Sequence, residues 1–129
     1  MKVMLSIRPR YVDSILAGDK RFEYRRRIFK RNDVNMMAIY STAPVSAVVA
    51  EASVGTVISG TLDEVWGKTS EWAGITYSEF ARYFCGCETA FAIALSEVRR
   101  LDEPVRLEDY APEVKRPPQS FVYLSDNDV

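Results

Sequence analysis

Hydrophobic and polar residues alternate along several short stretches of the chain, and this alternation is typical of strands with one buried face. It predicts six strands, at residues 3–7, 20–28, 36–42, 45–59, 90–101 and 120–124. Gly55 lies inside the longest stretch, where a glycine commonly marks a bulge or a bend in a barrel. Glu103-Pro104 is expected to end the fifth strand, because proline cannot donate a hydrogen bond to a sheet.

Apolar residues at helical spacing predict three helices, at residues 10–17, 61–74 and 76–84. The first ends at Gly18, since glycine readily adopts the left-handed conformation that terminates a helix. Thr61 and Thr76 each stand three residues before a glutamate, which is the capping-box pattern of a helix start. The chain therefore predicts an α+β domain over residues 1–129, a small and mostly antiparallel β-barrel with a helix after the first strand and a two-helix insertion at 61–87. A short turn is expected at 106–110, and the polar tail 125–129 is expected to fray.

The chain has 129 residues, the usual size of one domain, and no histidine. The lack of histidine excludes Ser-His-Asp and Cys-His catalysis and leaves too few ligands for a zinc site, so we expect neither a metal nor a cofactor. Cys85 and Cys87 are separated by one residue, a poor geometry for a disulfide, and as reduced thiols they indicate a cytoplasmic protein. No apolar stretch is long enough to span a membrane, and residues 1–11 are too interrupted for a signal peptide.

The net charge of −1 conceals an uneven distribution of charged residues. Residues 1–35 contain ten Lys and Arg against four Asp and Glu, whereas the rest of the chain contains seven against fourteen. If the basic residues converge in the fold, they form a surface that attracts anions. The alternative is a solvated charged face whose residues pair with one another.

The densest charges lie in the segment Gly18-Asp19-Lys20-Arg21-Phe22-Glu23-Tyr24-Arg25. Glu23 and Arg25 share one face of a regular strand, and a buried pair of this kind is better explained by binding than by stability, because desolvation offsets its attraction. Lys20 lies on the opposite face by strict alternation, but its stem is long enough to join them. Lys20 and Glu23 then form a nucleophile or acid with a base. The alternative is an edge strand whose Lys and Arg residues prevent aggregation.

The pattern Gly-x-Lys-x-x-Glu-x-Arg at Gly18, Lys20, Glu23 and Arg25 resembles the signature of ASCH domains, which belong to the PUA-like superfamily of small β-barrels. Three further blocks, in the right order along the chain, resemble the same family and its subset with a helical insertion. They are Met4-Leu5-Ser6-Ile7-Arg8-Pro9 with residues 15–18, Tyr40-Ser41-Thr42-Ala43-Pro44-Val45 with residues 49–51, and Pro117-Pro118-Gln119-Ser120-Phe121. The resemblance covers nearly the whole chain.

The resemblance implies a charged cleft between the first helix and the sheet, and a function in RNA binding linked to translation or transcription. Some small members of similar fold are instead ribonucleases, or amidohydrolases of acetylated cytidine. In the amidohydrolases a lysine of the same motif, here Lys20, is the expected nucleophile. Those members commonly have threonine where this chain has Glu23.

A second carboxylate is a further candidate for the same site. Glu51 lies in a strand of otherwise small and apolar residues. It could stand beside Lys20 or Arg25 as a catalytic group, and it could equally point to solvent.

The residues expected to contact a nucleotide or RNA ligand carry positive charge, a hydroxyl or amide group, an aromatic ring, or a turn of the motif. They are Arg8, Gly18, Lys20, Arg25, Arg27, Tyr40, Ser41, Thr42, Gln119 and Ser120. Arginines suit phosphate, aromatic rings stack on bases, and hydroxyl or amide groups reach phosphates and base edges. Ser41 and Thr42 are equally suited to forming the turn before Pro44.

These observations leave three hypotheses. The first is a domain that binds RNA or a modified nucleotide, with Lys20 and Arg25 at phosphate and Glu23 orienting Arg25 or contacting a base. The second is an enzyme on RNA or nucleosides, a ribonuclease or an amidohydrolase, in which Lys20, Glu23 and Glu51 carry the chemistry. The third is a protein-interaction domain that uses the aromatic insertion 61–87. The identity of the ligand and the oligomeric state are not predicted.

Overall fold

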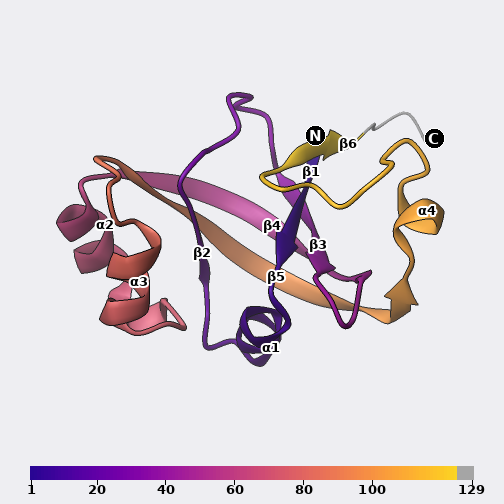
Figure 1. Ribbon diagram of the computed structural model, residues 1–129, viewed down its shortest axis with the longest axis horizontal. Helices are drawn as coiled ribbons and strands as arrows, with labels where there is room; N and C mark the ends of the chain where they lie inside the picture. Colours follow the sequence, from indigo (N-terminus) through magenta and orange to yellow (C-terminus); the bar gives the residue numbers. More distant parts are fainter. Residues whose placement is uncertain (125–129) are drawn as a thin grey trace.

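The computed structural model describes residues 1–124, so the prediction for the tail 125–129 lies outside the described residues (Figure 1). This part of the chain contains strands β1 (Lys2–Ile7), β2 (Phe22–Arg25), β3 (Met36–Ser41), β4 (Ala47–Gly60), β5 (Ala90–Val105) and β6 (Val122–Leu124). Its helices are α1 (Pro9–Ala17), α2 (Leu62–Thr69), the 3-10 helix η1 (Ser70–Trp72), α3 (Tyr77–Tyr83) and α4 (Leu107–Tyr110). The predicted α+β composition is confirmed.

The strands form one mixed sheet in the order β2-β5-β4-β3-β1-β6. The β1–β3 pair is parallel, because the chain crosses back through α1 and β2 before β3 begins, and the other neighbouring pairs are antiparallel. The edge strands β2 and β6 are only four and three residues long, and each pairs on one side only. The described sheet is therefore open and mixed, and it is not the closed barrel that we expected.

Both faces of the sheet are covered. On one face, α1 packs Val12 and Ile15 onto alternate residues of β1, β3 and β4. On the other face, α4 and the residues that follow it cover Met4, Tyr40 and Val48. Successive residues of a strand point to opposite faces, so neighbouring side chains of β1 and β3 contribute to two different cores.

The helical insertion has a core of its own. Figure 1 shows α2 and α3 at the end of the sheet where β4 leads into β5 through the insertion. Phe80 and Phe84 of α3 are fully buried, and Phe80 meets Tyr24 of β2 edge to face, with ring centroids 5.1 Å apart. Both helices begin with the predicted capping boxes, at Thr61 and Thr76. The insertion is thus rigidly packed against the strand that carries the charged motif.

Every strand has bounds that differ from the predicted ones by at least one residue, and the differences are largest in β2, predicted at 20–28, and β5, predicted at 90–101. β2 begins at Phe22 because the backbone N–H of Lys20 still bonds the end of α1, at Ser14 O (3.1 Å). β5 continues through Pro104 to Val105, so the prediction that the strand ends there is wrong. The register of β5 against β4 shifts in this stretch, and a proline is tolerated at such a bulge because no ladder bond is required of it.

Candidate functional site

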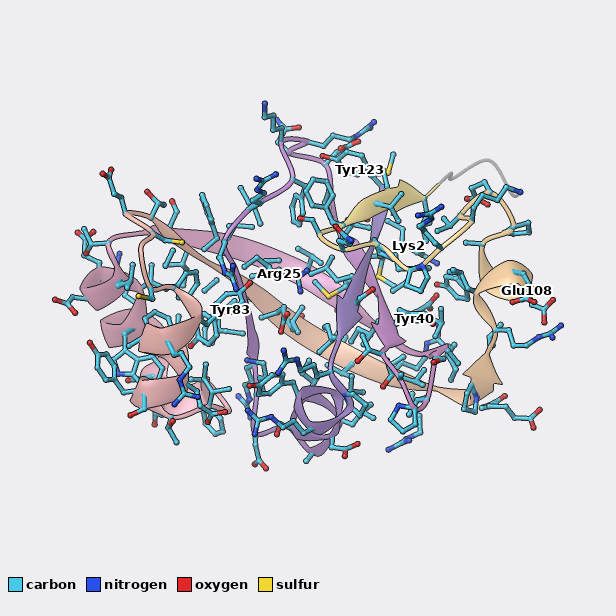
Figure 2. The ribbon with its side chains drawn as sticks, in the orientation of Figure 1. Lys2, Arg25, Tyr40, Tyr83, Glu108 and Tyr123 are labelled. Atoms are coloured by element: carbon cyan, nitrogen blue, oxygen red, sulfur yellow. The ribbon has the colours of Figure 1, made fainter. Side chains whose placement is uncertain are left out.

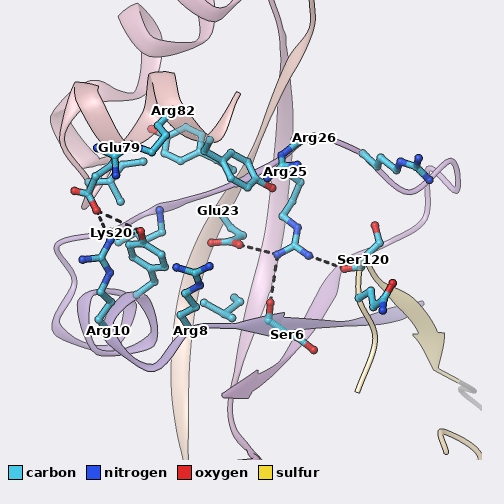
Figure 3. A pocket seen from close by; sticks show the side chains of 17 residues that line it. Ser6, Arg8, Arg10, Lys20, Glu23, Arg25, Arg26, Glu79, Arg82 and Ser120 are labelled. Atoms are coloured by element: carbon cyan, nitrogen blue, oxygen red, sulfur yellow. Dashed lines mark hydrogen bonds and ion pairs between the residues drawn. The ribbon is translucent and has the colours of Figure 1, made fainter. Parts of the chain in front are cut away.

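A pocket of about 780 Å³ lies between α1, β2 and α3, and the segment before β6 completes its wall (Figure 3). Its charged lining consists of seven basic and two acidic side chains. They are Arg8, Arg10, Lys20, Arg25, Arg26, Arg27 and Arg82, with Glu23 and Glu79. Because so many cations share one hollow, the pocket attracts anionic ligands.

Arg25 holds three segments of the chain together at the base of the pocket. Its guanidinium donates to Glu23 Oε2 at 3.0 Å, to the backbone oxygen of Ser6 at 3.4 Å and to that of Ser120 at 2.7 Å. Figure 3 shows these bonds radiating from one side chain. A planar guanidinium has donors in several fixed directions, which a lysine ammonium at this position would lack.

Glu23 lies almost completely inside the protein, with a side chain that is 8% exposed. Its Oε2 is bonded to Arg25, whereas its Oε1 has no hydrogen bond within the described residues. Every side-chain N or O atom that is sealed from solvent in those residues has a hydrogen-bond partner. Because Oε1 has none, it is not sealed from solvent, and it is accessible from the pocket that Glu23 lines. Glu23 therefore offers one carboxylate oxygen as an acceptor in an otherwise cationic site.

Lys20 is 3% exposed, which is unusual for a lysine. Its Nζ donates to the backbone oxygen of Ala73 at 3.0 Å and lies 4.7 Å from the ring centroid of Tyr24. Burial lowers the pKa of Lys20 below its ordinary 10.5, although the carboxylates of Glu23 and Glu79 act against this shift. The amine is therefore easier to deprotonate than that of a surface lysine.

Two tyrosines form aromatic walls of the pocket, and each carries an arginine on its ring. The guanidinium of Arg10 lies 4.6 Å from the ring centroid of Tyr11, and that of Arg26 lies 4.5 Å from Tyr83. Glu79 of α3 accepts hydrogen bonds from both Arg10 and Tyr11, so it joins the insertion to α1. Flat aromatic and guanidinium surfaces of this kind stack with nucleobases.

Six of the ten residues predicted to contact a ligand line this pocket, and they are Arg8, Lys20, Arg25, Arg27, Gln119 and Ser120. The other four do not line it. Gly18 terminates α1 with a φ of 86°. Tyr40 is buried in the core under α4 (Figure 2), and Ser41 is buried in β3. Thr42 accepts the backbone N–H of Val45 at 3.1 Å through its backbone oxygen, which supports the alternative of a role in the turn.

The predicted second carboxylate, Glu51, lies on the face of the sheet that α4 covers. It accepts hydrogen bonds from Lys2 (2.9 Å), Arg99 and Tyr110. Burial raises the pKa of Glu51, but the hydrogen bonds from Tyr110 and Lys2 outweigh burial, so the pKa lies below the ordinary 4.5. The structure therefore does not bring Glu51 to Lys20, because a residue of this face points away from the pocket.

Sequence reasoning missed the α3 wall of the pocket, which is formed by Glu79, Arg82 and Tyr83. From the sequence, Glu79 was expected only to cap a helix, and Arg82 and Tyr83 were given no role at this site. One signal was available, since residues spaced by three and four share a helix face, and this face carries two charges and an aromatic ring. Its contact with Arg10 and Tyr11 joins residues nearly 70 positions apart, and a local pattern does not encode such a contact.

Within residues 1–124, no helix is long and apolar enough to cross a membrane. No group of three or more His, Cys, Asp or Glu side chains in the same part of the chain could hold a metal ion.

Comparison with known proteins found relatives by sequence, although no family model matches the chain. An ASCH domain-containing ribonuclease from Zymomonas mobilis subsp. mobilis is 29% identical over 126 residues, which span 95% of this chain and 84% of that protein. Ribosomal protein uL22 from Ureaplasma parvum is 28% identical over 93 residues, which span 72% of this chain and 29% of that protein.

Solved structures from Zymomonas mobilis have the same fold. The crystal structure of its ASCH protein superposes with a TM-score of 0.88 at 27% identity, covering 97% of this chain and 88% of that one. Crystal structures of a tyrosine-to-phenylalanine and a serine-to-alanine variant also give 0.88, at 26% identity, and cover 91% and 89% of those chains.

Proposed function

Because this chain belongs to the ASCH domain family, we propose that it binds single-stranded RNA in the pocket around Lys20 and cleaves it there. The observation that carries the proposal is a buried lysine amine in one pocket with Glu23, Arg25 and further arginines. The name of the Zymomonas mobilis relative as a ribonuclease supports the same class of reaction.

The pocket offers separate surfaces for the parts of an RNA chain. Arg8, Arg27 and Arg82 suit the backbone phosphates, because guanidinium groups bind phosphate oxygens with short, charge-assisted hydrogen bonds. Tyr11 and Tyr83 suit the bases, which stack on aromatic rings when they are not paired in a duplex. Single-stranded RNA presents both features at once.

Lys20 is the proposed general base. Since burial lowers its pKa, more of its amine is neutral near pH 7 than for an exposed lysine, and a neutral amine takes a proton from a ribose 2′-hydroxyl. The 2′-oxygen attacks the adjacent phosphorus, the bond from phosphorus to the 5′-oxygen of the next nucleotide breaks, and that oxygen takes a proton from water. The arginines that suit the backbone phosphates, Arg8, Arg27 and Arg82, stabilise the negative charge that develops on the phosphate. The products are a 2′,3′-cyclic phosphate end and a 5′-hydroxyl end.

Glu23 is proposed to hold Arg25 and to select what enters the pocket. Its Oε1 repels phosphate and accepts a hydrogen bond from a ribose hydroxyl or from the amino group of a base. The carboxylate thus directs the sugar or the nucleobase, rather than the phosphate, to the bottom of the pocket.

Cleavage is tested by incubating the protein with end-labelled single-stranded RNA and resolving the products on a gel. We expect fragments with 2′,3′-cyclic phosphate ends, and a rate about 100-fold lower for Lys20→Ala. Glu51→Gln is the control, because Glu51 lies on the opposite face, and it should keep the wild-type rate. RNA that stays intact with the wild-type protein would overturn the proposal of cleavage.

The same buried amine also suits attack on an acyl carbon, so acetylated cytidine is the second substrate to test. Deacetylation by the wild-type protein and not by Lys20→Ala, with RNA left intact, would replace the ribonuclease proposal by the amidohydrolase one.

The setting of this activity is proposed from the sequence. We place it in the cytoplasm because of the reduced cysteines, in one domain over residues 1–129, and in the regulation of translation or transcription that the family resemblance implies. Protein interaction through the insertion 61–87 is the weaker alternative, because Phe80 and Phe84 are buried inside it, although Trp72 and Tyr77 are exposed.

A further inference from the structure

Three consecutive residues of the insertion, Trp72, Ala73 and Gly74, contact the start of the motif, and we call them the lysine clamp. The backbone oxygen of Trp72 accepts the N–H of Arg21 at 2.8 Å, and the guanidinium of Arg21 lies 3.9 Å from the Trp72 ring centroid. The backbone oxygen of Ala73 accepts Lys20 Nζ at 3.0 Å. The clamp therefore holds the main chain beside Lys20 as well as the tip of its side chain.

Gly74 is the residue that permits this approach. Its φ is +68°, a conformation that residues with a side chain rarely adopt. A Cβ at Gly74 would lie 2.8 Å from Lys20 Cγ and 3.1 Å from its Cα, and closer still to its Cβ. Because the backbone of Lys20 fixes the position of its Cβ, a rotamer change of Lys20 cannot relieve the overlap with that atom.

We propose that the lysine clamp positions Lys20 in the pocket, and that Gly74 is a positioning residue because only glycine lets the clamp lie against the lysine. The clamp acts through Lys20 and does not touch the substrate. Its consequence for cleavage rests on the proposed function, whereas its effect on Lys20 is measurable without any substrate.

The clamp determines both the direction and the environment of the amine. The hydrogen bond to Ala73 O engages one Nζ–H, which leaves the lone pair of the neutral amine for the pocket that Lys20 lines. The segment also excludes water from Lys20, whose low exposure is the cause of its lowered pKa. The other groups that face Lys20 are the rings of Tyr11 and Tyr24 and the carboxylates of Glu23 and Glu79, the latter paired with Arg10.

The test compares Gly74→Ala with Gly86→Ala. Gly86 also has a positive φ, of +86°, but nothing lies within 4 Å of the position of its Cβ, so the pair separates contact with Lys20 from backbone strain. The pKa of Lys20 is measured by NMR titration of its Cε–Nζ group. In Gly74→Ala we expect the pKa to rise toward 10.5 and kcat to fall about 100-fold with little change in KM, since the arginines stay in place. Gly86→Ala should keep both wild-type values.

An unchanged Lys20 pKa in folded Gly74→Ala protein would overturn the proposal that the clamp positions Lys20. An equal rise of this pKa in Gly86→Ala would do the same. If Gly74→Ala does not fold, Trp72→Ala replaces it as the test variant, because it removes the stack with Arg21 without adding an atom. A Lys20 pKa that stays at the wild-type value in Trp72→Ala also overturns the proposal. A clamp-dependent pKa in a protein that leaves RNA intact refutes the proposed function alone. Cleavage by the wild-type protein with a clamp-independent pKa refutes the clamp alone.

Discussion

Lys20 is a residue whose position works against the stability of the protein that contains it. Its folded-state pKa is lowered, so the unfolded chain binds its proton more tightly than the native protein does between the lowered value and 10.5. Below the lowered pKa, the free-energy cost of burying the charged amine is fully present. Stability rises with pH between the lowered pKa and 10.5, and above 10.5 the cost disappears. The proposed function accounts for such a residue, since activity and stability commonly oppose each other in a binding site.

Replacing Lys20 by methionine should therefore stabilise the protein and abolish cleavage. The side chain keeps its length and loses its charge, so we expect about 1 kcal/mol of added stability at pH 7, measured by urea unfolding. The gain should shrink as the pH approaches 10. Lys68→Met, at an exposed site, should change stability little. A Lys20→Met protein that is less stable than wild type at pH 7 would contradict this account.

Arg25 should not tolerate replacement by lysine, although the charge is conserved. Lysine cannot bond Glu23, Ser6 O and Ser120 O together, and it leaves buried acceptors unsatisfied. We expect a loss of about 2 kcal/mol in the free energy of unfolding and weaker RNA binding. The matched variant is Arg27→Lys, which keeps a charge in the pocket where no such set of bonds exists. Equal effects of the two substitutions would refute the special role of Arg25.

At the scale of elements, α3 contributes both a helix cap and a wall of the pocket. Thr76 caps α3 because its side-chain oxygen accepts a hydrogen bond from the N–H of Glu79. The Glu79 carboxylate in turn accepts a hydrogen bond from the N–H of Thr76. The same carboxylate accepts from Arg10 and Tyr11 of α1. The backbone hydrogen bond at Thr76 is the main reason that the pKa of Glu79 lies below 4.5. The cap of one helix is thus the link to another.

Thr76→Ala should therefore affect both folding and binding. We expect a loss of about 1 kcal/mol of stability and a raised KM for RNA, because Glu79 is less firmly held beside Arg10. Thr61→Ala is the matched control, since Thr61 caps α2 with the same capping box through Glu64, which does not line the pocket. It should cost similar stability and leave KM unchanged. An unchanged KM in Thr76→Ala would refute the link between cap and pocket.

Elements differ in how far the sequence predicts them. The charged strand is shorter than predicted, but Glu23 and Arg25 share a face as expected and both line the pocket, because alternation within one strand is local information. Tyr40 was assigned to the ligand although it faces α4, since the face that a strand residue occupies depends on register with distant strands. Whether the sheet is open or closed likewise depends on whether its two edge strands pair with each other, and no local sequence pattern predicts such a pairing.

At the scale of the whole molecule, the two faces of the sheet have separate tasks. The pocket lies on one side, and the Lys2–Glu51–Tyr110 network on the other ties α4 to β1 and β4. Since the pKa of Glu51 is lowered in the folded state, its contribution to stability is present above 4.5 and is lost as the pH falls through the folded-state value. The network is suited to stabilise the fold, while the pocket is suited to bind a ligand.

Glu51→Gln should lower stability and leave RNA cleavage intact. We expect a loss of about 2 kcal/mol at pH 7, because a neutral amide cannot satisfy Lys2, Arg99 and Tyr110 as a carboxylate does. The difference from wild type should narrow as the pH falls toward 3, as followed by thermal unfolding in buffers across that range. A stability difference that stays constant over this range would show that the charge of Glu51 is not its source.

The bonds of Arg25 also have a consequence for the order in which the protein is made. They join β1, near the start of the chain, to Ser120, and residues emerge from a ribosome in sequence order. The basic segment therefore emerges early, next to ribosomal RNA, while its pocket still lacks the insertion and the last wall. The proposed cleavage needs all of these parts, so we expect the nascent chain to stay inactive until nearly the whole domain has emerged. On this proposal, the topology delays the activity until the protein has left the ribosomal RNA that it meets first.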